Sequence, residues 1–442
     1  MTCQTWLSFM KLSSLLEALP EYKLFEPKDR NITQITDDSR NVKKGCIFVA
    51  VKGLNVNAHK LIPEVLEKGA QVVVGEESPK KDWLKKTTYV KVGNSRKALG
   101  LLASQWFDNP SSKLKVVGVT GTKGKTTTVH LIYHILTSLG KRTGLISSIT
   151  YPGLHVTTPG SIELQKLLKD MVDNNFKYAV IEVSSHGIDQ DRIAGVKFEV
   201  GVLTNIAPEH LDYHKTFTEY KKIKMSFINS AEVKVICPKT TKINVLPGKF
   251  NNLNAEAATR VVQVLGIDRQ KVISTLNSFK LPEGRLEEVE NNKGIKIYID
   301  FAHTPDSLEA VLIYLKSIKK GKLISVFGSA GERDAQKRSK MGEIAARYSD
   351  TIILTSEDPR SEDPSDIIYQ IRSGISKNFK DVIEIVNRKK AIKEAIRIAE
   401  PGDTVALFGK GHEKSMNLDG IQETPWSEHE VVRFALEKKS QN

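Results

Sequence analysis

Residues 114–128 of the chain, LKVVGVTGTKGKTTT, join an apolar run to a loop of glycines, lysines and threonines. The next residues, 129–136, have the apolar spacing of a helix. A strand, a glycine-rich loop and a helix in this order form a phosphate site, because glycines let backbone N–H groups approach phosphate oxygens and the helix N-terminus adds positive potential. The stretch therefore predicts phosphate binding within an α/β domain.

Within this loop, the residue types suit a nucleotide and its metal ion. Lys125 can reach the β- and γ-phosphates, and the Thr126 hydroxyl can bind Mg²⁺. Val119 stands where the strict P-loop spacing has its first glycine, so the loop departs from that pattern. The other predicted phosphate contacts are Gly121, Thr122, Gly124 and Thr127.

The residues after the loop predict a parallel sheet. Apolar runs at 178–183 and 200–203 alternate with helix-length segments, which is typical of parallel strands covered by helices on both faces. A Leu-Pro-Glu-Gly linker at 281–284 ends this part of the chain. We therefore predict a central ATP-binding domain at 113–282.

Two further α/β segments flank the central domain. Before it, apolar runs at 46–51 and 71–74 surround a helical pattern at 61–66, and an Asn-Pro-Ser-Ser turn marks the end of this domain. The first domain is predicted at 1–112. After the central domain, strands separated by helices predict a Rossmann-like domain at 283–442. Its predicted strands lie at 295–301, 323–327, 351–354 and 404–408.

The composition narrows the classes of function. The 442 residues include 66 Lys and Arg against 52 Asp and Glu, a formal charge of +14 that favours anionic ligands. The basic residues are scattered and lack interleaved aromatics, so we expect no nucleic-acid partner. The three cysteines are far apart and predict neither a disulfide framework nor a zinc site. No apolar run reaches the roughly 18 residues of a membrane span. We expect the protein to be cytoplasmic and monomeric.

Several motifs together resemble the Mur ligase family. They are the loop at 118–127, Glu-Val-Ser-Ser-His-Gly at 182–187 and Thr-Asn-Ile-Ala-Pro-Glu-His-Leu-Asp-Tyr-His at 204–214. The likeness extends from Asp-Ser-Arg at 38–40 to Gly-Lys-Gly-His-Glu at 409–413. It implies a three-domain α/β architecture with a central P-loop ATPase-type parallel sheet, and an ATP-dependent ligase of peptidoglycan biosynthesis. Within the family, the likeness is greatest to the branch that adds the third amino acid to UDP-N-acetylmuramoyl-L-alanyl-D-glutamate.

The resemblance also implies a magnesium site beside the phosphate loop. Glu182 ends one predicted strand and His210 follows another, and open α/β sheets bind ligands at the carboxyl ends of their strands. Magnesium prefers oxygen, which suits Thr126 and Glu182. His210 is included because the family uses a histidine at this place on a second ion.

Lys224 lies on the apolar face of a predicted helix. The i, i+3, i+4, i+7 rule places it beside Tyr220, Ile223 and Phe227, whereas the lysines at 221–222 point elsewhere. Partial desolvation favours a neutral amine, and a neutral amine can take up CO₂. In the family the matching lysine is carbamylated, and the resemblance implies a CO₂-derived carbamate on Lys224 that helps to hold Mg²⁺.

Further matching segments are expected to bind the UDP-sugar and its peptide. Hydroxyl groups and an arginine suit phosphate, sugar and carboxylate groups. One departure is Asn-Ala-His at 57–59, where the family has Asp-Gly-His. The residues that the resemblance implies for this ligand are Ser39, Thr157, Thr158, Ser184, Gln190 and Arg192.

The third domain is expected to complete the ATP site and to bind the incoming amino acid. By resemblance, Arg285 would contact the phosphates and Asp300 the ribose or adenine side. Arg360 stands in the place of a family arginine that grips a distal carboxylate, which favours meso-diaminopimelate over L-lysine, because like charges in a confined site repel. The expected amino-acid contacts are Arg333, Asp358, Arg360, Gly409 and Glu413.

Two departures keep L-lysine open as the acceptor. The motif at 357–360 reads Glu-Asp-Pro-Arg where the family has Asp-Asn-Pro-Arg, so Asp358 adds a negative charge that attracts an ammonium group. Met416 stands where the family has a glutamine after Glu413. Both changes fall in the region expected to contact the amino acid.

The implied reaction begins when the D-glutamate side-chain carboxylate attacks the γ-phosphate of ATP, and the amine of the third amino acid then displaces phosphate from the acyl phosphate. Two other functions share parts of the pattern. Folylpolyglutamate synthase has the same loop and chemistry but lacks the uridine-binding domain that the segment at 38–40 indicates. A non-catalytic Mur-like subunit is disfavoured because Lys125, Glu182 and Lys224 are intact.

Overall fold

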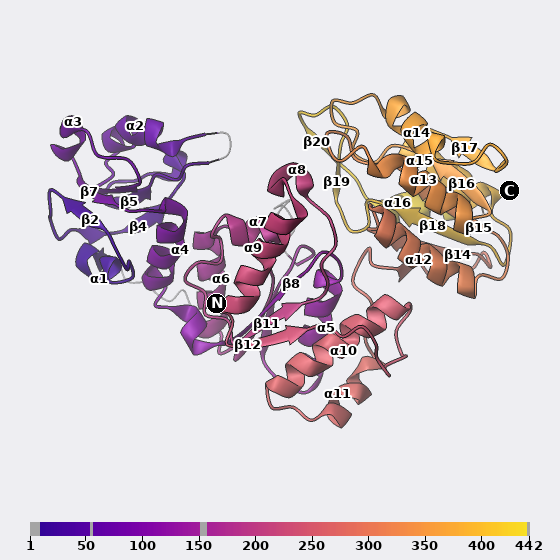
Figure 1. The fold of residues 1–442 in the computed structure, drawn as a ribbon, viewed down its shortest axis with the longest axis horizontal. Helices are drawn as coiled ribbons and strands as arrows, with labels where there is room; N and C mark the ends of the chain where they lie inside the picture. The colour runs from indigo at the N-terminus through magenta and orange to yellow at the C-terminus, as the bar shows by residue number, and fades with distance from the viewer. Residues whose placement is uncertain (1–8, 54–55, 151–156, 440–442) are drawn as a thin grey trace. The chain divides into compact units, whose positions relative to one another are not determined.

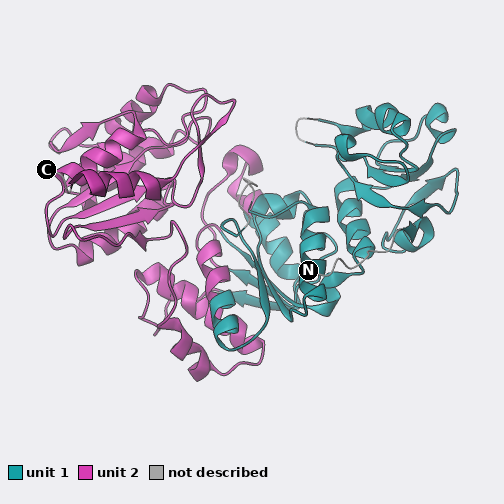
Figure 2. Cartoon of the chain, turned by 180° about the vertical axis from the view of Figure 1, so that it is seen from behind, with its two compact units in different colours: residues 1–121, 132–203, 221–236 teal, residues 122–131, 204–220, 237–442 magenta. Residues whose placement is uncertain are grey.

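A computed structural model describes residues 9–53, 56–150 and 157–439 of the chain. The chain forms two compact units, shown in Figure 2. Unit 1 comprises residues 1–121, 132–203 and 221–236, and unit 2 comprises residues 122–131, 204–220 and 237–442. Cys3 lies outside the described residues, and the other two cysteines, Cys46 and Cys237, are free thiols.

The first sheet, in unit 1, is covered on both faces. Its strand order is β2 (Lys23–Phe25), β7 (Thr88–Lys91), β6 (Val72–Gly75), β5 (Cys46–Val49) and β4 (Gln34–Thr36), with only β2 antiparallel. Alternate residues of β5 enter two apolar clusters, because successive side chains of a strand point to opposite faces. Ile47 packs in the cluster that includes α4 (Ser95–Trp106), and Phe48 packs in the cluster that includes α2 (Ile62–Glu67).

The second sheet, also in unit 1, is entirely parallel. Its strand order is β12 (Val233–Ile236), β11 (Val200–Leu203), β8 (Lys115–Thr120), β10 (Tyr178–Glu182) and β9 (Thr143–Ile146). Glu182 pairs in register with Val119, and Leu203 pairs with Thr120. The three middle strands therefore end at one edge of the sheet, and the phosphate loop begins at this edge.

The third sheet, in unit 2, has helices on both faces (Figure 1). Its strand order is β13 (Glu287–Glu288), β14 (Lys296–Asp300), β18 (Thr404–Phe408), β15 (Leu323–Phe327), β16 (Thr351–Leu354) and β17 (Val382–Glu384), with only β13 antiparallel. One apolar cluster packs α12 (Pro305–Ile318), α13 (Lys337–Tyr348) and α14 (Pro364–Ser373) on the sheet. A second cluster packs α15 (Arg388–Ile398) and α16 (Glu428–Lys439) on it.

The remaining helices and two strand pairs complete the described fold. The other helices are α1 (Leu12–Leu16), α3 (Lys81–Leu84), α5 (Lys125–Ser138), α6 (Ser161–Asp173), α7 (Ser185–Asp189), α8 (Leu211–His214), α9 (Phe217–Ser230), α10 (Lys249–Val264) and α11 (Arg269–Leu276), with 3-10 turns at 39–41, 58–61 and 110–113. Two antiparallel pairs are β1 (Met10–Lys11) with β3 (Asn31–Ile32) and β19 (Ser415–Asn417) with β20 (Glu423–Pro425). Within the part of the chain that the structure describes, no helix has the length and apolarity that crossing a membrane requires.

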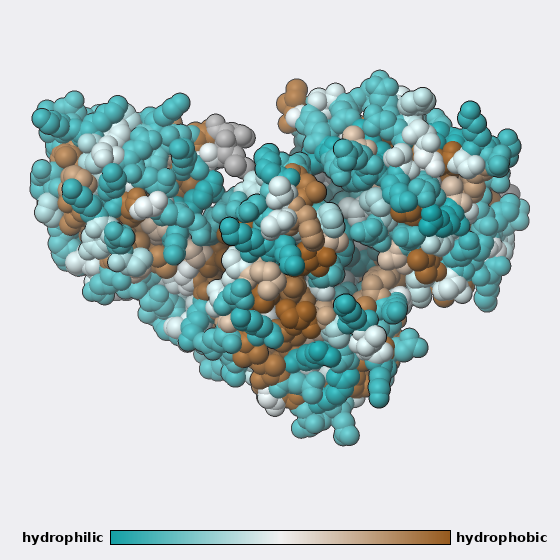
Figure 3. Space-filling model, viewed as in Figure 1, coloured by the Kyte–Doolittle hydropathy of each residue, from teal (hydrophilic) through white to brown (hydrophobic). Residues whose placement is uncertain are grey.

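The α/β fold class predicted from the sequence is confirmed, including the parallel central sheet and the doubly wound third sheet. The domain boundaries predicted at residues 112 and 282 stay predictions. The face of the molecule in Figure 3 is largely hydrophilic, in keeping with a charged fraction of 27%.

Candidate active site

The phosphate loop is shaped by a close approach between Gly124 and Asn254. Gly124 lies directly before α5 and has φ +79°, a backbone conformation that residues other than glycine rarely adopt. A Cβ atom at this position would lie 2.5 Å from Oδ1 of Asn254 on α10. The bare backbone therefore lets the loop pass the asparagine and leads straight into the N-terminus of a helix, where anions bind.

The segment after β11 holds the loop in place from the other side. The backbone N–H of Ala207 donates to Thr122 Oγ1 at 2.9 Å, and the Lys123 N–H donates to Asn205 Oδ1 at 2.9 Å. Thr122 Oγ1 also lies 3.0 Å from the hydroxyl of Tyr220 on α9. Thr122 is buried, so its hydroxyl fixes the loop and is engaged by protein groups on both sides.

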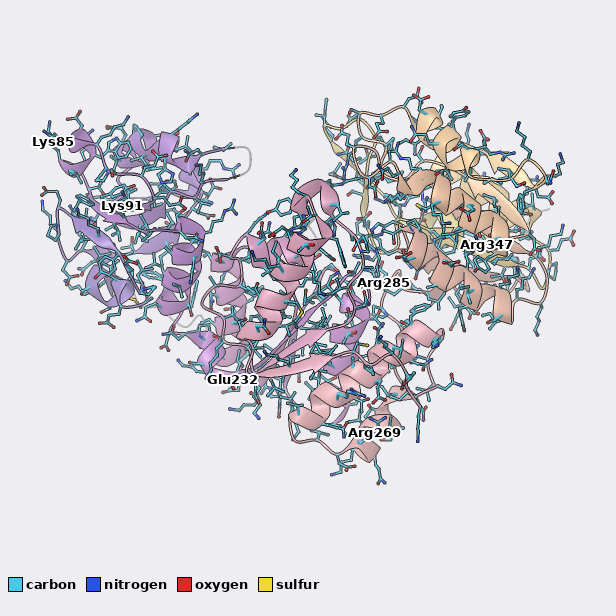
Figure 4. All side chains as sticks on the ribbon, viewed as in Figure 1. Lys85, Lys91, Glu232, Arg269, Arg285 and Arg347 are labelled. Carbon is cyan, nitrogen blue, oxygen red and sulfur yellow. The ribbon has the colours of Figure 1, made fainter. Side chains whose placement is uncertain are left out.

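Arg285 lies against the start of helix α5. Its Nη2 atom donates to Thr126 Oγ1 at 3.3 Å, although 159 positions separate the two residues in the chain. The guanidinium carbon lies 4.6 Å from the centre of the Phe301 ring, and Nη1 lies 3.3 Å from Nδ1 of His412. Figure 4 labels Arg285. The structure thus brings this predicted phosphate-binding arginine to the predicted magnesium-binding threonine, within unit 2.

Lys125 and Asp300 are engaged with backbone groups. Lys125 Nζ donates to the carbonyl oxygen of Thr122 at 3.0 Å. The Asp300 carboxylate accepts the N–H groups of Leu286 at 2.6 Å and Ala302 at 2.7 Å. Burial raises the pKa of Asp300 to about 6, against the opposing effect of the Arg285 charge and these two N–H groups. Asp300 therefore fixes the backbone next to Arg285.

Glu182 lies at the end of β10 among the residues predicted to bind the sugar and peptide. The Glu182 side chain is buried, and its Oε2 atom accepts from the N–H of Ser148 at 3.3 Å and from its hydroxyl at 3.2 Å. The Glu182 carbonyl accepts the Thr158 hydroxyl at 3.1 Å. Thr158 Oγ1 also lies 3.1 Å from Ser184 Oγ. These contacts are all within unit 1.

Arg192 extends the same cluster. Its Nη1 atom donates to the carbonyl of Thr158 at 2.8 Å, and its Nη2 atom donates to Gln190 Oε1 at 2.7 Å. Four of the predicted sugar and peptide contacts, Thr158, Ser184, Gln190 and Arg192, therefore lie together beside Glu182. Thr157 is half-buried and directly precedes Thr158.

Lys224 lies beneath the phosphate loop. Its side chain is 1% exposed, and Nζ donates to the Gly121 carbonyl at 2.9 Å and lies 3.4 Å from Thr120 Oγ1. Tyr220 and Phe227 on the same helix are also buried, whereas residues 221–222 are exposed. The predicted apolar face of this helix is confirmed, and it delivers a buried lysine to the first glycine of the loop.

His210 belongs to a charged group in unit 2. It adopts φ +55°, and its Nε2 atom lies 4.0 Å from Glu209 Oε2. Glu209 also forms an ion pair with Lys123 and lies 3.7 Å from Nε2 of His303. Burial alone would raise the pKa of Glu209, but the charges of Lys123, His303, Lys125 and His210 outweigh it and lower the pKa to about 2.

The residues predicted to hold magnesium offer oxygen atoms. Among the described residues, no group of three or more His, Cys, Asp or Glu side chains is arranged to hold a metal ion. Magnesium is usually bound by one or two protein oxygens together with phosphates and waters. The Thr126 hydroxyl, in unit 2, and the Glu182 carboxylate, in unit 1, are the groups predicted as ligands of this kind.

The loops after β16 and β18 bring predicted amino-acid contacts together. The buried ammonium of Lys410 lies between Asp358, at 2.9 Å, and Glu413, at 2.5 Å. Arg360, with φ +54°, donates from Nη1 to the Gly331 carbonyl at 3.3 Å. A Cβ atom at Gly409 would lie 2.7 Å from Glu357 Oε2, so glycine permits the close packing of the two loops.

Arg333 and the predicted first-domain residues have other partners. Arg333 Nη1 lies 3.3 Å from Asp212 Oδ2. Ser39 begins a 3-10 turn in which Asp38 accepts hydrogen bonds from the Arg40 side chain and backbone, and these bonds lower the pKa of Asp38. In the segment 57–59, the histidine is buried and bonded within its own domain, which is the role of a structural residue.

Sequence reasoning missed three residues that lie at the site. Asn254 packs against Gly124, His412 lies beside Arg285, and Glu209 pairs with Lys123. The run Gly-Lys-Phe-Asn-Asn-Leu-Asn at 248–254, which opens α10, is a signal that could have pointed to Asn254. Glu209 and His412 lie inside quoted motifs, but nothing in their spacing indicates which partners they have.

Comparison with known protein families gives matches to one family along most of the chain. Three family models match: the Mur ligase family catalytic domain at residues 31–107, the Mur ligase middle domain at 119–264 and the Mur ligase glutamate ligase domain at 284–411. Each model falls on a different one of the three large sheets.

Relatives similar to this chain carry a common name. A UDP-N-acetylmuramoyl-L-alanyl-D-glutamate 2,6-diaminopimelate ligase of Cytophaga hutchinsonii is 36% identical, covering 97% of this chain and 99% of the relative. A protein of the same name, numbered 1, from Clostridium acetobutylicum is 38% identical, covering 96% of this chain and 98% of the relative. A solved structure named as such a ligase is 26% identical with a TM-score of 0.64, covering 98% of this chain and 100% of that one.

Proposed function

The chain belongs to the Mur ligase family, and from this premise we propose that it joins 2,6-diaminopimelate to UDP-N-acetylmuramoyl-L-alanyl-D-glutamate at the expense of ATP. The observation that carries this proposal is the match, over nearly the whole chain, to relatives named for this reaction. The contact within unit 2 that joins Thr126 to Arg285 supports the use of a nucleoside triphosphate.

The reaction proceeds through an acyl phosphate. A D-glutamate carboxylate oxygen attacks the γ-phosphorus of ATP, the bond to the bridging oxygen breaks, and ADP leaves. Charge spreads over the transferring phosphoryl oxygens in this step, so its main demand is electrostatic stabilisation. Lys125, at the start of α5, and Arg285, bonded to Thr126, supply positive charge. The neutral acceptor amine then attacks the acyl carbon, phosphate leaves, and the nitrogen loses a proton to give the amide.

The magnesium ligands follow from the family assignment. Bound Mg²⁺ would neutralise charge on the phosphates, with Thr126 and Glu182 as oxygen ligands and His210 on a second ion. The burial of Lys224 supports a carbamate on its amine, because an ammonium in this setting is desolvated and a neutral amine reacts with CO₂, losing a proton. The carbamate keeps one N–H, which can still donate to the Gly121 carbonyl.

The two substrates that the ligase joins would be held by separate groups of residues. The cluster of Thr158, Ser184, Gln190 and Arg192, with Thr157 and Ser39, is assigned to the UDP-sugar and peptide. For the amino acid, Arg360 is assigned to the distal carboxylate, and Asp358 and Glu413 to ammonium groups. Gly409, Arg333, Asp300 and the loop residues Gly121, Thr122, Gly124 and Thr127 keep the roles that the resemblance implies.

The place of action and the assembly are part of the proposal. Free thiols at Cys46 and Cys237 support a reducing compartment, the cytoplasm. We assign a monomer, and sedimentation of the purified protein across a concentration series tests that assignment.

A direct ligation assay tests the proposed function. Purified protein is given the UDP-muramoyl dipeptide, ATP and Mg²⁺ with one of a panel of amino acids, and both ADP and the new peptide are measured. We expect both products with meso-diaminopimelate and far less of each with L-lysine. Formation of no peptide with either amino acid would overturn the proposal. Peptide with L-lysine alone would overturn the choice of acceptor.

A further inference from the structure

Lys410 is a buried cation in the loop that follows strand β18. Its side chain is 1% exposed, and its Nζ atom lies 2.9 and 3.0 Å from the two oxygens of Asp358 and 2.5 Å from Glu413 Oε2. The carboxylates are themselves more accessible, with 18% of the Asp358 side chain and 35% of the Glu413 side chain exposed. One buried ammonium group therefore joins two carboxylates that are themselves partly exposed.

The loop gives Lys410 little freedom to leave this position. Gly409 and Gly411, on either side of it, have φ +106° and +51°. A Cβ atom at Gly411 would lie 2.8 Å from Cβ of Phe301, so the backbone is confined. The Glu413 N–H donates to the Lys410 carbonyl at 2.9 Å, which closes a turn. Its two carboxylate partners raise the pKa of Lys410 although burial opposes this, so the group stays an ammonium.

Asp358 is held by Lys410 and by the backbone of the neighbouring strand. The N–H of Asn417, on β19, donates to Asp358 Oδ1 at 3.0 Å, and the Asn417 carbonyl accepts the Arg360 N–H at 3.1 Å. The Asp358 carboxylate, the Lys410 ammonium and the backbone of Arg360 are thus held in one arrangement. Formally, the charges of Asp358 and Glu413 balance those of Lys410 and Arg360, and the neighbouring buried Glu357 interacts with the further cations Lys337 and Arg388.

We propose that Lys410 is a positioning residue that sets acceptor selectivity by balancing the charge of Asp358 and Glu413. This inference rests on the proposed function. The distal end of diaminopimelate carries a carboxylate and an ammonium group and is neutral overall, whereas the distal end of lysine carries only an ammonium group. A pocket without net charge favours the neutral end, because a bare cation gains too little there to repay its lost hydration. A pocket with net negative charge favours the lysine cation.

Three variants test the proposal through the ratio of kcat/KM for meso-diaminopimelate to that for L-lysine. Lys410→Met makes the pocket negative, and a negative pocket attracts the distal ammonium group of lysine. We expect the ratio to fall about tenfold or more, because an uncompensated charge in a confined site changes affinity by at least that factor. Asp358→Asn makes the pocket positive, and we expect the ratio to rise. The double variant restores neutrality and should return the ratio to within about threefold of the original value.

Lys414→Met provides a matched control, because this lysine is exposed and lies outside the acceptor arrangement. We expect its ratio to equal that of the unmodified protein, and we expect the KM for ATP to be unchanged in all four variants. A purely structural role for Lys410 would lower turnover with both acceptors equally and leave the ratio constant.

The two single variants are expected to shift the acceptor ratio in opposite directions, so the proposal can be tested even if Lys410→Met folds poorly. An unchanged or lowered ratio in Asp358→Asn would overturn the proposal by itself, as would an unchanged ratio in a folded Lys410→Met protein. These failures differ from failure of the proposed function, in which the unmodified protein forms peptide with neither acceptor and the selectivity role falls as well.

Discussion

At the scale of single residues, Lys224 combines a charged side chain with nearly complete burial. Its Nζ atom donates to the Gly121 carbonyl at 2.9 Å, in the first turn of the phosphate loop. Burial removes hydration from an ammonium group, and the proposed carbamate would replace the positive charge with a metal ligand. The residue is thus the most informative position for testing the proposed chemistry.

We expect Lys224→Ala to lower kcat by at least about a thousandfold, the scale of a lost group that stabilises transferring charge. Added formate or acetate should restore part of the activity, because a small carboxylate can enter the space that the side chain leaves. The measurement is ADP formation with and without the added acid. Lys221→Ala, on the exposed face of the same helix, should keep full activity and show no response to the acid. Full activity of Lys224→Ala would contradict a role in catalysis.

Residue patterns predicted some of these positions and missed others for a physical reason. The 3.6-residue period of a helix is local, so the buried face of Lys224, Tyr220 and Phe227 could be predicted from the sequence. The contact between Gly124 and Asn254 depends on how distant segments fold together, and no local period reports it. The same is true of Lys410, because one of its two partners, Asp358, is distant in the sequence and the other, Glu413, is near.

At the scale of elements, helices α15 and α16 meet at a buried ion pair. Arg388, the first residue of α15, donates from Nε to Glu428 Oε2 at 3.2 Å, and both side chains are at most 1% exposed. The same guanidinium donates to the Phe408 carbonyl at 2.8 Å and to the Ser356 carbonyl at 3.3 Å. These two carbonyls directly precede the loops that carry Gly409 and Asp358, so one side chain holds the ends of both loops.

We expect Arg388→Met to lower the free energy of unfolding by about 3–5 kcal/mol, because it leaves the Glu428 carboxylate buried without its cationic partner. Replacing both residues by apolar ones should cost less than this single change. Urea unfolding measures both values. Arg397→Met provides the control: its pair with Glu394 is largely exposed, and the loss should stay below about 1 kcal/mol. A loss of that small size in Arg388→Met would contradict the structural role.

A second contact of helix α16 makes stability depend on pH. His429 Nε2 lies 3.0 Å from Glu287 Oε2, and the same oxygen accepts the N–H of Gly284 at 2.7 Å. The hydrogen bond to Glu287 raises the pKa of His429 above 6.5. Burial would raise the pKa of Glu287, but the contacts of His429 and Gly284 hold it below 4.5. The charged pair thus stabilises the segment that carries Arg285.

The sign of the pH dependence follows from these two shifts. The His429 contribution is complete below pH 6.5 and is lost as the pH rises through its raised pKa, whereas the Glu287 contribution is complete above pH 4.5 and is lost on acidification. We expect His429→Gln to reduce unfolding free energy most between these values, by about 1 kcal/mol. The deficit should shrink by pH 9 in denaturant titrations. A deficit that grows with pH would contradict the charged pair.

The element patterns explain how much of the fold could be predicted. Buried strands such as β5, β8, β15 and β18 are continuous apolar runs, and their existence was predicted from the sequence. The edge strand β12 has a mostly exposed pattern, and β9 is short and contains Thr and Gly. Neither has an apolar run long enough to distinguish it from a loop, so both were missed.

At the scale of the whole molecule, the order of motifs along the chain was more informative than any single motif. The phosphate loop alone indicates a nucleotide, and the full set from 38–40 to 409–413 resembles one family of ligases. The family models match in the same order, at 31–107, 119–264 and 284–411. The choice of acceptor could not be settled in the same way, because it depends on a few charges around Asp358.

Transfer of labelled oxygen tests the central claim, formation of an acyl phosphate, most directly. The UDP-muramoyl dipeptide is prepared with ¹⁸O in the D-glutamate side-chain carboxylate and converted with ATP, Mg²⁺ and meso-diaminopimelate. The account predicts one ¹⁸O atom in each phosphate released, because the attacking carboxylate oxygen leaves with the phosphoryl group. Phosphate without the label, formed alongside ADP and the new peptide, would contradict it.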